Sequence, residues 1–119
     1  TAHYWYADLR NGCTVPLLSI VDASVKELSL LADTGSTIGI IATRATLDAQ
    51  IFDPALVRSG YTVLLPDEIV MNTLVLPGIE FVKAGDPLRA GPLIEEAVQS
   101  LLNQGAHAVI LACTETSLC

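Results

Sequence analysis

Four short apolar runs, separated by sequence with helical spacing, limit most strongly the folds open to this chain. The runs are VPLLSIV at 15–21, TIGIIA at 37–42, YTVLL at 61–65 and HAVILAC at 107–113. Short runs that are apolar throughout are typical of strands buried on both faces. A helix in each connection makes neighbouring strands parallel. We therefore expect an α/β fold, with a four-stranded parallel sheet and helices on both of its faces.

Capping residues and breakers indicate where the connecting helices begin and end. Ser24 and Glu27 form a capping box that would begin the helix after the first strand. Residues 47–57 have helical spacing, but Pro54 would interrupt them. The clearest helix spans 92–104, and we expect Pro92 to open it. Residues 77–91 are predicted to form a short helix followed by an ordered loop.

Composition and charge exclude several classes of protein. The chain has 119 residues, is 51% hydrophobic and 16% charged, and carries a net charge of −7. Such a chain forms a single folded domain, and its few scattered basic residues argue against nucleic-acid binding. No apolar run is long enough for a membrane helix. Three cysteines, without the spacing of disulfide-rich domains, indicate free thiols and a cytoplasmic location.

Ligands in open α/β sheets bind beyond the carboxyl ends of the strands. Those ends are predicted at 21–24, 42–46, 65–68 and 113–116, and two of these segments are rich in threonine. Thr43 and Thr46 are hydroxyls three residues apart where a strand becomes a helix. Such a pair can cap the helix or help to bind a carboxylate.

Cys113 has several interpretations at this stage. A cysteine after an apolar strand is often a packing residue, and a disulfide to Cys119 is poorly supported in a cytoplasmic chain. A metal site is excluded, because His107 lies about 20 Å away along a strand that rises roughly 3.3 Å per residue. A cysteine nucleophile would need a nearby histidine, for which only His3 remains.

Two further features carry weaker alternatives. Residues 33–36 read Asp-Thr-Gly-Ser, the signature of aspartic proteases, but helical sequence precedes them where the protease needs a strand. We interpret this segment as a turn after a helix. Lys83, one of two lysines, lies next to Phe81 and Val82. It is either a solvated surface residue or a partner for a substrate carboxylate.

Four motifs in order resemble the aspartate/glutamate racemase family, and aspartate racemases most closely. They are TAHYW at the start, GIIATRAT at 39–46, VKAG at 82–85 and GAHAVILACTE at 105–115. The resemblance covers the whole chain and implies one of the two similar domains of the racemase fold. It divides the chain into 1–12, a helix that follows the first catalytic motif, and 13–119, an α/β domain that ends at the second cysteine motif.

The resemblance implies a function and a set of site residues. Cys113 would be one of two thiols that exchange the α-proton of an acidic amino acid, aspartate before glutamate, without a cofactor or a metal. The other thiol would lie two residues before Thr1, so we infer that the chain is a fragment and expect it to be inactive alone. The residues implied to bind the substrate are Thr1, Thr43, Thr46, Lys83, Thr114 and Glu115.

The resemblance also implies a small-molecule partner and a full-length homodimer, with no nucleic-acid or membrane partner. Two alternatives stay open. Relatives on the same fold racemise hydantoins or isomerise maleate. A non-catalytic α/β module that binds a ligand would keep the threonines and Lys83 but would have no cysteine before Thr1.

Overall fold

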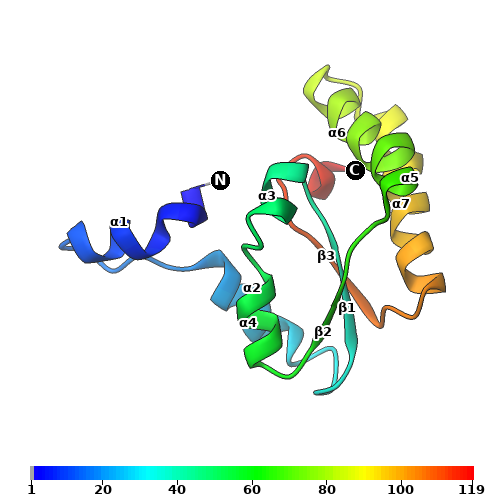
Figure 1. Ribbon diagram of the computed structural model, residues 1–119. Coiled ribbons are helices and arrows are strands. Elements are labelled where there is room, and N and C mark those ends of the chain that lie inside the picture. Colours follow the sequence, from blue (N-terminus) through cyan, green and yellow to red (C-terminus); the bar gives the residue numbers. More distant parts are fainter. Residues whose placement is uncertain (1) are drawn as a thin grey trace.

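A computed structural model of the protein describes residues 2–119 as an α/β fold (Figure 1). In chain order its elements are the 3-10 helix η1 (Ala2–Trp5), α1 (Tyr6–Gly12), α2 (Ile20–Leu28), β1 (Thr37–Ile41), α3 (Arg44–Asp48), α4 (Asp53–Arg58), β2 (Thr62–Leu64), α5 (Glu68–Val70), the π-helix η2 (Met71–Val75), α6 (Leu76–Lys83), α7 (Pro87–Asn103), β3 (Ala108–Leu111) and the 3-10 helix η3 (Thr116–Leu118). No helix among these combines the length and the apolar character needed to cross a membrane.

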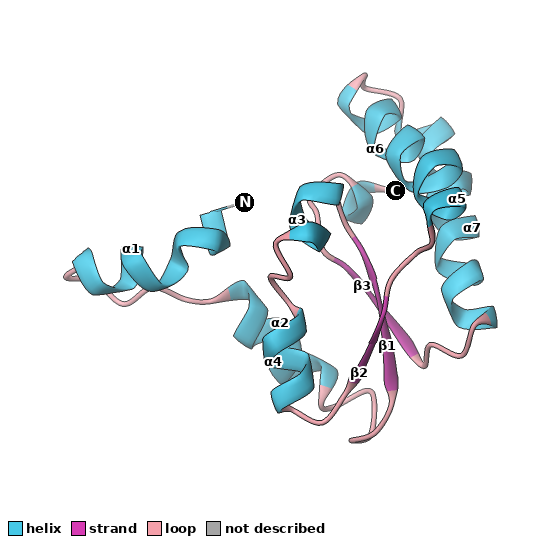
Figure 2. Cartoon of the chain, viewed as in Figure 1, coloured by secondary structure: helices cyan, strands magenta, loops and turns pink. Residues whose placement is uncertain are grey.

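The sheet is parallel, and over the described residues it has three strands in the order β2-β1-β3. Helices cover both faces: α2 and α4 lie on one side, and α5, α6 and α7 lie on the other (Figures 1 and 2). The central strand β1 contributes to both layers, because successive side chains of a strand point to opposite faces. Ile38 and Ile40 pack with Leu56 and Tyr61 on the α2/α4 side.

The second hydrophobic layer lies between the sheet and α7. Ile41 packs there with Val75, Ile79 and Leu101. Gly39 allows α7 to approach β1 closely, since a Cβ at this position would lie 3.0 Å from Leu101 Cδ1. The parallel fold with two covered faces is therefore as predicted, and three of the four predicted apolar runs build its sheet.

The prediction of a strand at 15–21, the first of the four predicted strands, is wrong. The residues of this segment other than Val21 are exposed or half-buried, and Leu18 is 92% exposed. α2 begins at Ile20, and Ser19 Oγ accepts a hydrogen bond from Asp22 N at 3.1 Å. Tyr6 Oη donates to Leu17 O at 2.9 Å, so a side chain takes a carbonyl that a strand would use for pairing. The helix therefore starts before the predicted capping box at Ser24.

The prediction for residues 77–92 was also partly wrong. α6 continues to Lys83, and α7 begins at Pro87, where Asp86 caps it by accepting from Arg89 N at 3.3 Å. Pro92 lies inside α7 and lacks the N–H that would bond to the carbonyl of Leu88. Leu88 is 88% exposed, so water can reach that turn of the helix. The predicted break at Pro54 is confirmed, because α3 and α4 are separate helices.

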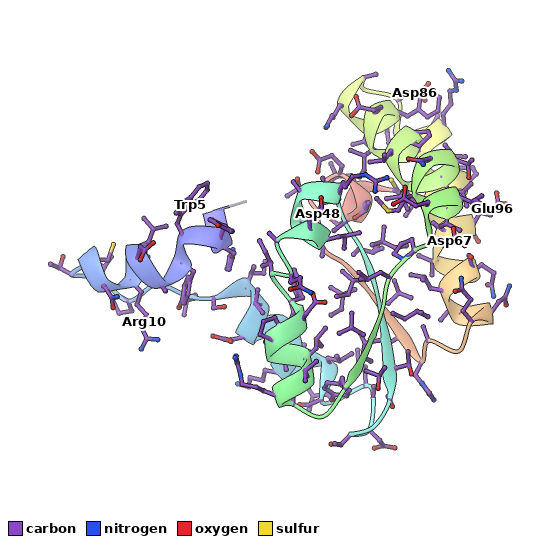
Figure 3. All side chains as sticks on the ribbon, in the orientation of Figure 1. Trp5, Arg10, Asp48, Asp67, Asp86 and Glu96 are labelled. Carbon is purple, nitrogen blue, oxygen red and sulfur yellow. The ribbon has the colours of Figure 1, made fainter. Side chains whose placement is uncertain are left out.

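The segment at 33–36 forms the predicted turn. Ser36 N donates to Asp33 O at 3.1 Å, and Gly35 has a φ of 95° that suits glycine. The N-terminal helix α1 has no buried residues and extends away from the sheet (Figure 1). Figure 3 shows Trp5 and Arg10 pointing away from the rest of the molecule.

Candidate functional site

A cleft of about 490 Å³ opens at the carboxyl edge of the sheet. Its walls come from the N-terminal segment, the start of α2, the turn from β1 into α3, and the end of β3. Figure 1 shows α3 and the C-terminal segment side by side at this edge. The residues of most chemical interest in its lining are His3, Thr43, Thr46, Cys113, Thr114 and Glu115.

Strand register brings the two main parts of the site together. Ile41 pairs with Leu111, and Ala112 N donates to Ile41 O at 2.7 Å. Thr43 and Cys113 each follow their strand by two residues. They therefore emerge at the same edge of the sheet, although 70 residues of sequence separate them. Both lie where the sequence predicted.

Thr43 and Thr46 form a hydrogen-bonded pair. Thr43 caps α3 by accepting from Thr46 N at 3.3 Å, and the two hydroxyl oxygens lie 3.0 Å apart. One hydroxyl hydrogen is used between the two oxygens, so the other is left for a ligand. Thr46 is buried, at 3% exposure, and Thr43 is half-buried. Thr43 thus caps α3 and both threonines line the cleft, whereas the binding of a carboxylate by this pair stays a prediction.

Cys113 is half-buried on the cleft wall, and its sulfur lies 3.3 Å from the hydroxyl oxygen of Thr116. Thr116 is fully buried and donates to the carbonyl of Cys113 at 3.0 Å. Thr116 was not among the residues predicted from the sequence. The signal available was its spacing, three residues after Cys113, which suits a hydroxyl that bonds back to a turn.

The next two residues form a short polar pair beside the thiol. Thr114 Oγ1 donates to Glu115 Oε2 at 3.1 Å. The pKa of Glu115 is lowered first by its own backbone N–H and then by the Thr114 hydroxyl, while Lys83 and Cys113 contribute less. Glu115 is therefore a carboxylate at neutral pH, and it lines the cleft next to Cys113.

Lys83 lies outside the lining of the cleft, unlike the other described residues that were predicted to bind substrate. Its ammonium pairs with Glu80 Oε1 at 2.9 Å, and that hydrogen bond is the main reason why the pKa of Lys83 is raised. Glu115 and Cys113 also act electrostatically on Lys83, although more weakly. The ammonium is thus near the site, but Glu80 holds it.

Thr1 lies outside the described residues. His3 lines the cleft, and its Nε2 accepts from Ile20 N at 3.0 Å while its ring stacks on Tyr6 at 5.7 Å. Sequence analysis considered His3 only as the base of a cysteine nucleophile. The position of His3 in the cleft depends on the contact between the N-terminal segment and α2. No local sequence motif predicts that contact.

His107 and the two other cysteines are not part of the cleft lining. His107 is at the opposite edge of the sheet, where its Nδ1 accepts from Thr37 N at 3.2 Å. Cys13 and Cys119 are exposed, and no disulfide links the described cysteines. Partial desolvation raises the pKa of Cys119, and Cys113 adds a smaller effect. Within residues 2–119, no group of three or more His, Cys, Asp or Glu side chains could hold a metal ion.

Comparison with known sequences agrees with the resemblance to the racemase family. The sequence profile described as Asp/Glu/Hydantoin racemase matches residues 1–119. An uncharacterized protein in the pnlA 3' region of Pectobacterium carotovorum subsp. carotovorum is 30% identical over 114 residues, which are 96% of this chain and 74% of that protein. The broad specificity amino-acid racemase RacX of Bacillus subtilis is 25% identical over 117 residues, which are 97% of this chain and 48% of RacX.

Proposed function

The chain belongs to the Asp/Glu/hydantoin racemase family, and we propose from this premise that it serves the racemisation of an α-amino acid, with Cys113 as an acid/base thiol. The observation that carries the proposal is the position of Cys113. It is a half-buried thiol on the wall of a cleft that also holds the Thr43–Thr46 hydroxyl pair. A group that accepts a proton and donors for a carboxylate are thus available in the same cleft.

Proton transfer by Cys113 would begin from the thiolate. The thiolate takes the α-proton, so the C–H bond breaks, an S–H bond forms, and the electron pair moves into the substrate carboxylate. A second thiol on the opposite face then gives a proton to the carbon, which inverts its configuration. We propose that this thiol comes from the motif that the resemblance places before Thr1. The reverse reaction exchanges the two roles.

The intermediate needs donors where its negative charge develops. We propose that the Thr43–Thr46 pair supplies one through its remaining hydroxyl hydrogen, and that Thr1 and Thr114 bind the same carboxylate. Thr114 currently donates to Glu115, so it would have to turn toward the substrate. Glu115, a carboxylate, would accept a hydrogen bond from the α-ammonium group of the substrate.

Aspartate, followed by glutamate, is the first substrate proposed, and Lys83 is the reason. Its ammonium acts electrostatically on Glu115 and Cys113. Both Lys83 and Glu80 are at least half exposed. An exposed pair is weakly held, so a second substrate carboxylate could replace Glu80.

A broader substrate range is the second candidate. The cleft has an apolar wall that includes Ile20, Ile51 and Phe52, which suits an uncharged side chain. RacX, one of the relatives, is described as a broad specificity amino-acid racemase.

We also propose that the full-length protein acts without a cofactor, as a homodimer in the cytoplasm, in line with the family resemblance.

The test is α-proton exchange in D₂O, followed by proton NMR. Aspartate, glutamate, alanine and leucine would be incubated with the longer parent protein, its Cys113→Ala variant and its Cys13→Ala variant. We expect exchange in the parent and in Cys13→Ala, which alters an exposed thiol outside the cleft lining. Cys113→Ala should lose at least about 100-fold in the exchange rate of the enantiomer whose α-proton faces Cys113, so each amino acid is supplied separately as its L and its D form.

Retention of full exchange by Cys113→Ala would refute the role of the thiol. A parent protein that exchanges none of these amino acids would refute amino-acid racemisation. Hydantoins and maleate would then be the next substrates, and binding without turnover of any of them would favour the ligand-binding module.

A further inference from the structure

Thr116 makes two contacts with one residue, Cys113, through a single hydroxyl group. Its Oγ1 donates to the carbonyl oxygen of Cys113 at 3.0 Å and lies 3.3 Å from the sulfur. The side chain has no solvent exposure, so water does not compete for the hydroxyl. Both contacts come from the first residue of η3, three residues after Cys113.

The number of hydrogens determines what these contacts can be. A threonine hydroxyl has one hydrogen and accepts through its oxygen. Because that hydrogen is donated to the Cys113 carbonyl, the sulfur contact requires the thiol S–H to donate to Thr116 Oγ1. The observed geometry therefore fits a protonated Cys113, with its S–H directed toward Thr116.

Loss of the thiol proton would change this arrangement. A thiolate has no hydrogen to give, so its contact with Thr116 is repulsive unless the hydroxyl turns its hydrogen toward sulfur. A hydrogen bond to an ionised acceptor is roughly twice as strong as one to a neutral acceptor. The rotation therefore exchanges a neutral hydrogen bond to the carbonyl for a charge-assisted bond to sulfur.

We propose that the Thr116 hydroxyl is a donor switch that follows the protonation state of Cys113: it bonds to the carbonyl when Cys113 is a thiol and to the sulfur when Cys113 is a thiolate. Thr116 thereby stabilises the thiolate without introducing a positive charge into the cleft. Its use in catalysis rests on the proposed function, whereas the effect on the thiol itself does not.

The neighbouring charged and titratable groups do not replace this hydroxyl. Glu115, two residues after Cys113, is a carboxylate and disfavours a second negative charge beside it. Lys83 on α6 is paired with Glu80. Cys119 lies at the end of the chain, and His3 lines the cleft from the N-terminal segment with its Nε2 already accepting from Ile20 N. The Thr116 hydroxyl lies within hydrogen-bonding distance of the Cys113 sulfur, at 3.3 Å.

The pH dependence of Cys113 alkylation measures the thiolate directly. The full-length protein would be treated with iodoacetamide across a range of pH, and modification of Cys113 would be quantified by mass spectrometry of its peptide. Resolving the peptides separates Cys113 from Cys13 and Cys119. No substrate is needed, so the result does not depend on racemase activity.

Thr116→Val keeps the side-chain shape and removes the hydroxyl. We expect the midpoint of its alkylation profile to rise by about 0.5–1 pH unit. Thr116→Ser, which keeps the hydroxyl, should stay within a few tenths of a unit of the wild type. Ser117→Ala is the matched control, because Ser117 Oγ makes the equivalent bond to the Thr114 carbonyl at 2.9 Å and has no contact with the sulfur.

An unchanged midpoint in Thr116→Val, or an equal rise in Ser117→Ala, would overturn the proposal. Thr116→Ala provides the same comparison if the valine variant does not fold, which circular dichroism would reveal. The two proposals can also fail separately. A shifted midpoint without α-proton exchange in the parent supports the switch and refutes racemisation, whereas exchange with an unshifted midpoint does the reverse.

Discussion

Thr43 and Cys113 occupy equivalent places at the carboxyl edge of the sheet, each two residues beyond the paired residues Ile41 and Leu111. The parallel pairing of β1 with β3 sets this relationship, so it does not depend on loop conformation. A hydroxyl donor and a thiol are thereby held on adjacent strands of the sheet.

Removing the Thr43 hydroxyl should affect both stability and substrate binding. Thr43→Val deletes the cap of α3, for which we expect a loss of about 1 kcal/mol in the free energy of unfolding. Loss of a carboxylate donor should also raise KM by about tenfold. Urea denaturation and steady-state kinetics measure the two effects. Thr43→Ser keeps the hydroxyl, and a loss of binding as large in Ser as in Val would exclude the hydroxyl as its cause.

Thr114→Val should raise the pKa of Glu115 toward the ordinary value. The Thr114 hydroxyl is the second-largest cause of the lowered pKa, after the backbone N–H of Glu115 itself, so part of the shift should remain. The lowered folded pKa contributes stability above the unfolded value, and this contribution is lost as the pH falls through the folded pKa. NMR titration of the Glu115 carboxyl carbon measures the change. No change in Thr114→Val would show that the 3.1 Å contact is not maintained in solution.

Glu80→Gln should increase the preference for acidic substrates, because it removes the ion partner that holds Lys83. We expect the ratio of kcat/KM for aspartate over alanine to rise by about two- to fivefold, consistent with a weak exposed pair. Lys83→Met should lower the same ratio. Glu96→Gln removes an equal charge from an exposed position on α7 that points away from the sheet (Figure 3). An equal rise in this control would indicate a general effect of net charge.

Gly78→Ala should destabilise the protein by more than Gly91→Ala does. A Cβ at position 78 on α6 would lie 2.7 Å from Cδ1 of Ile94, which is buried on α7. Since Ile94 must move, we expect a loss of about 1 kcal/mol or more despite the gain in helix propensity. Gly91 has nothing within 4 Å of such a Cβ apart from its chain neighbours. It precedes Pro92, whose ring disfavours helical backbone for a residue with a Cβ, so the gain in helix propensity is offset and we expect a smaller change than at position 78. Thermal unfolding of both variants tests the pair, and equal shifts would contradict the packing of α6 against α7.

The sequence predicted the parts of this fold that local pattern determines. Buried, β-branched runs between helices located β1, β2 and β3, and parallel pairing then predicted that Thr43 and Cys113 share an edge. The run at 15–21 is also mostly apolar, although it contains Pro16, and the structure gives it no pairing partner. Side chains of the N-terminal segment bond its backbone instead. Composition alone could not reveal this, because pairing is a property of the whole sheet.

The candidate site was predictable to a similar extent. Cys113 and the Thr43–Thr46 pair follow from their positions after strands. The Glu80–Lys83 pair depends on helical geometry, because the two residues lie three apart on α6. The prediction for 77–91, a short helix followed by a loop, did not fix where that helix ends. Thr116 was missed because burial turns an ordinary turn residue into a hydroxyl directed at sulfur. Such burial results from packing around η3 rather than from the spacing of residues.

The central strand β1 contributes side chains to both hydrophobic layers and has a paired neighbour at each edge. Exchange of its amide hydrogens with solvent therefore requires both layers to open. The β1 amides should be among the slowest in the protein to exchange. The amides of α1, which buries no side chain, should exchange at the other extreme. Protection should thus fall along a gradient from the interior of the sheet to the N-terminal helix. The end of β1, which leads to Thr43, should therefore stay folded when the N-terminal segment has already opened.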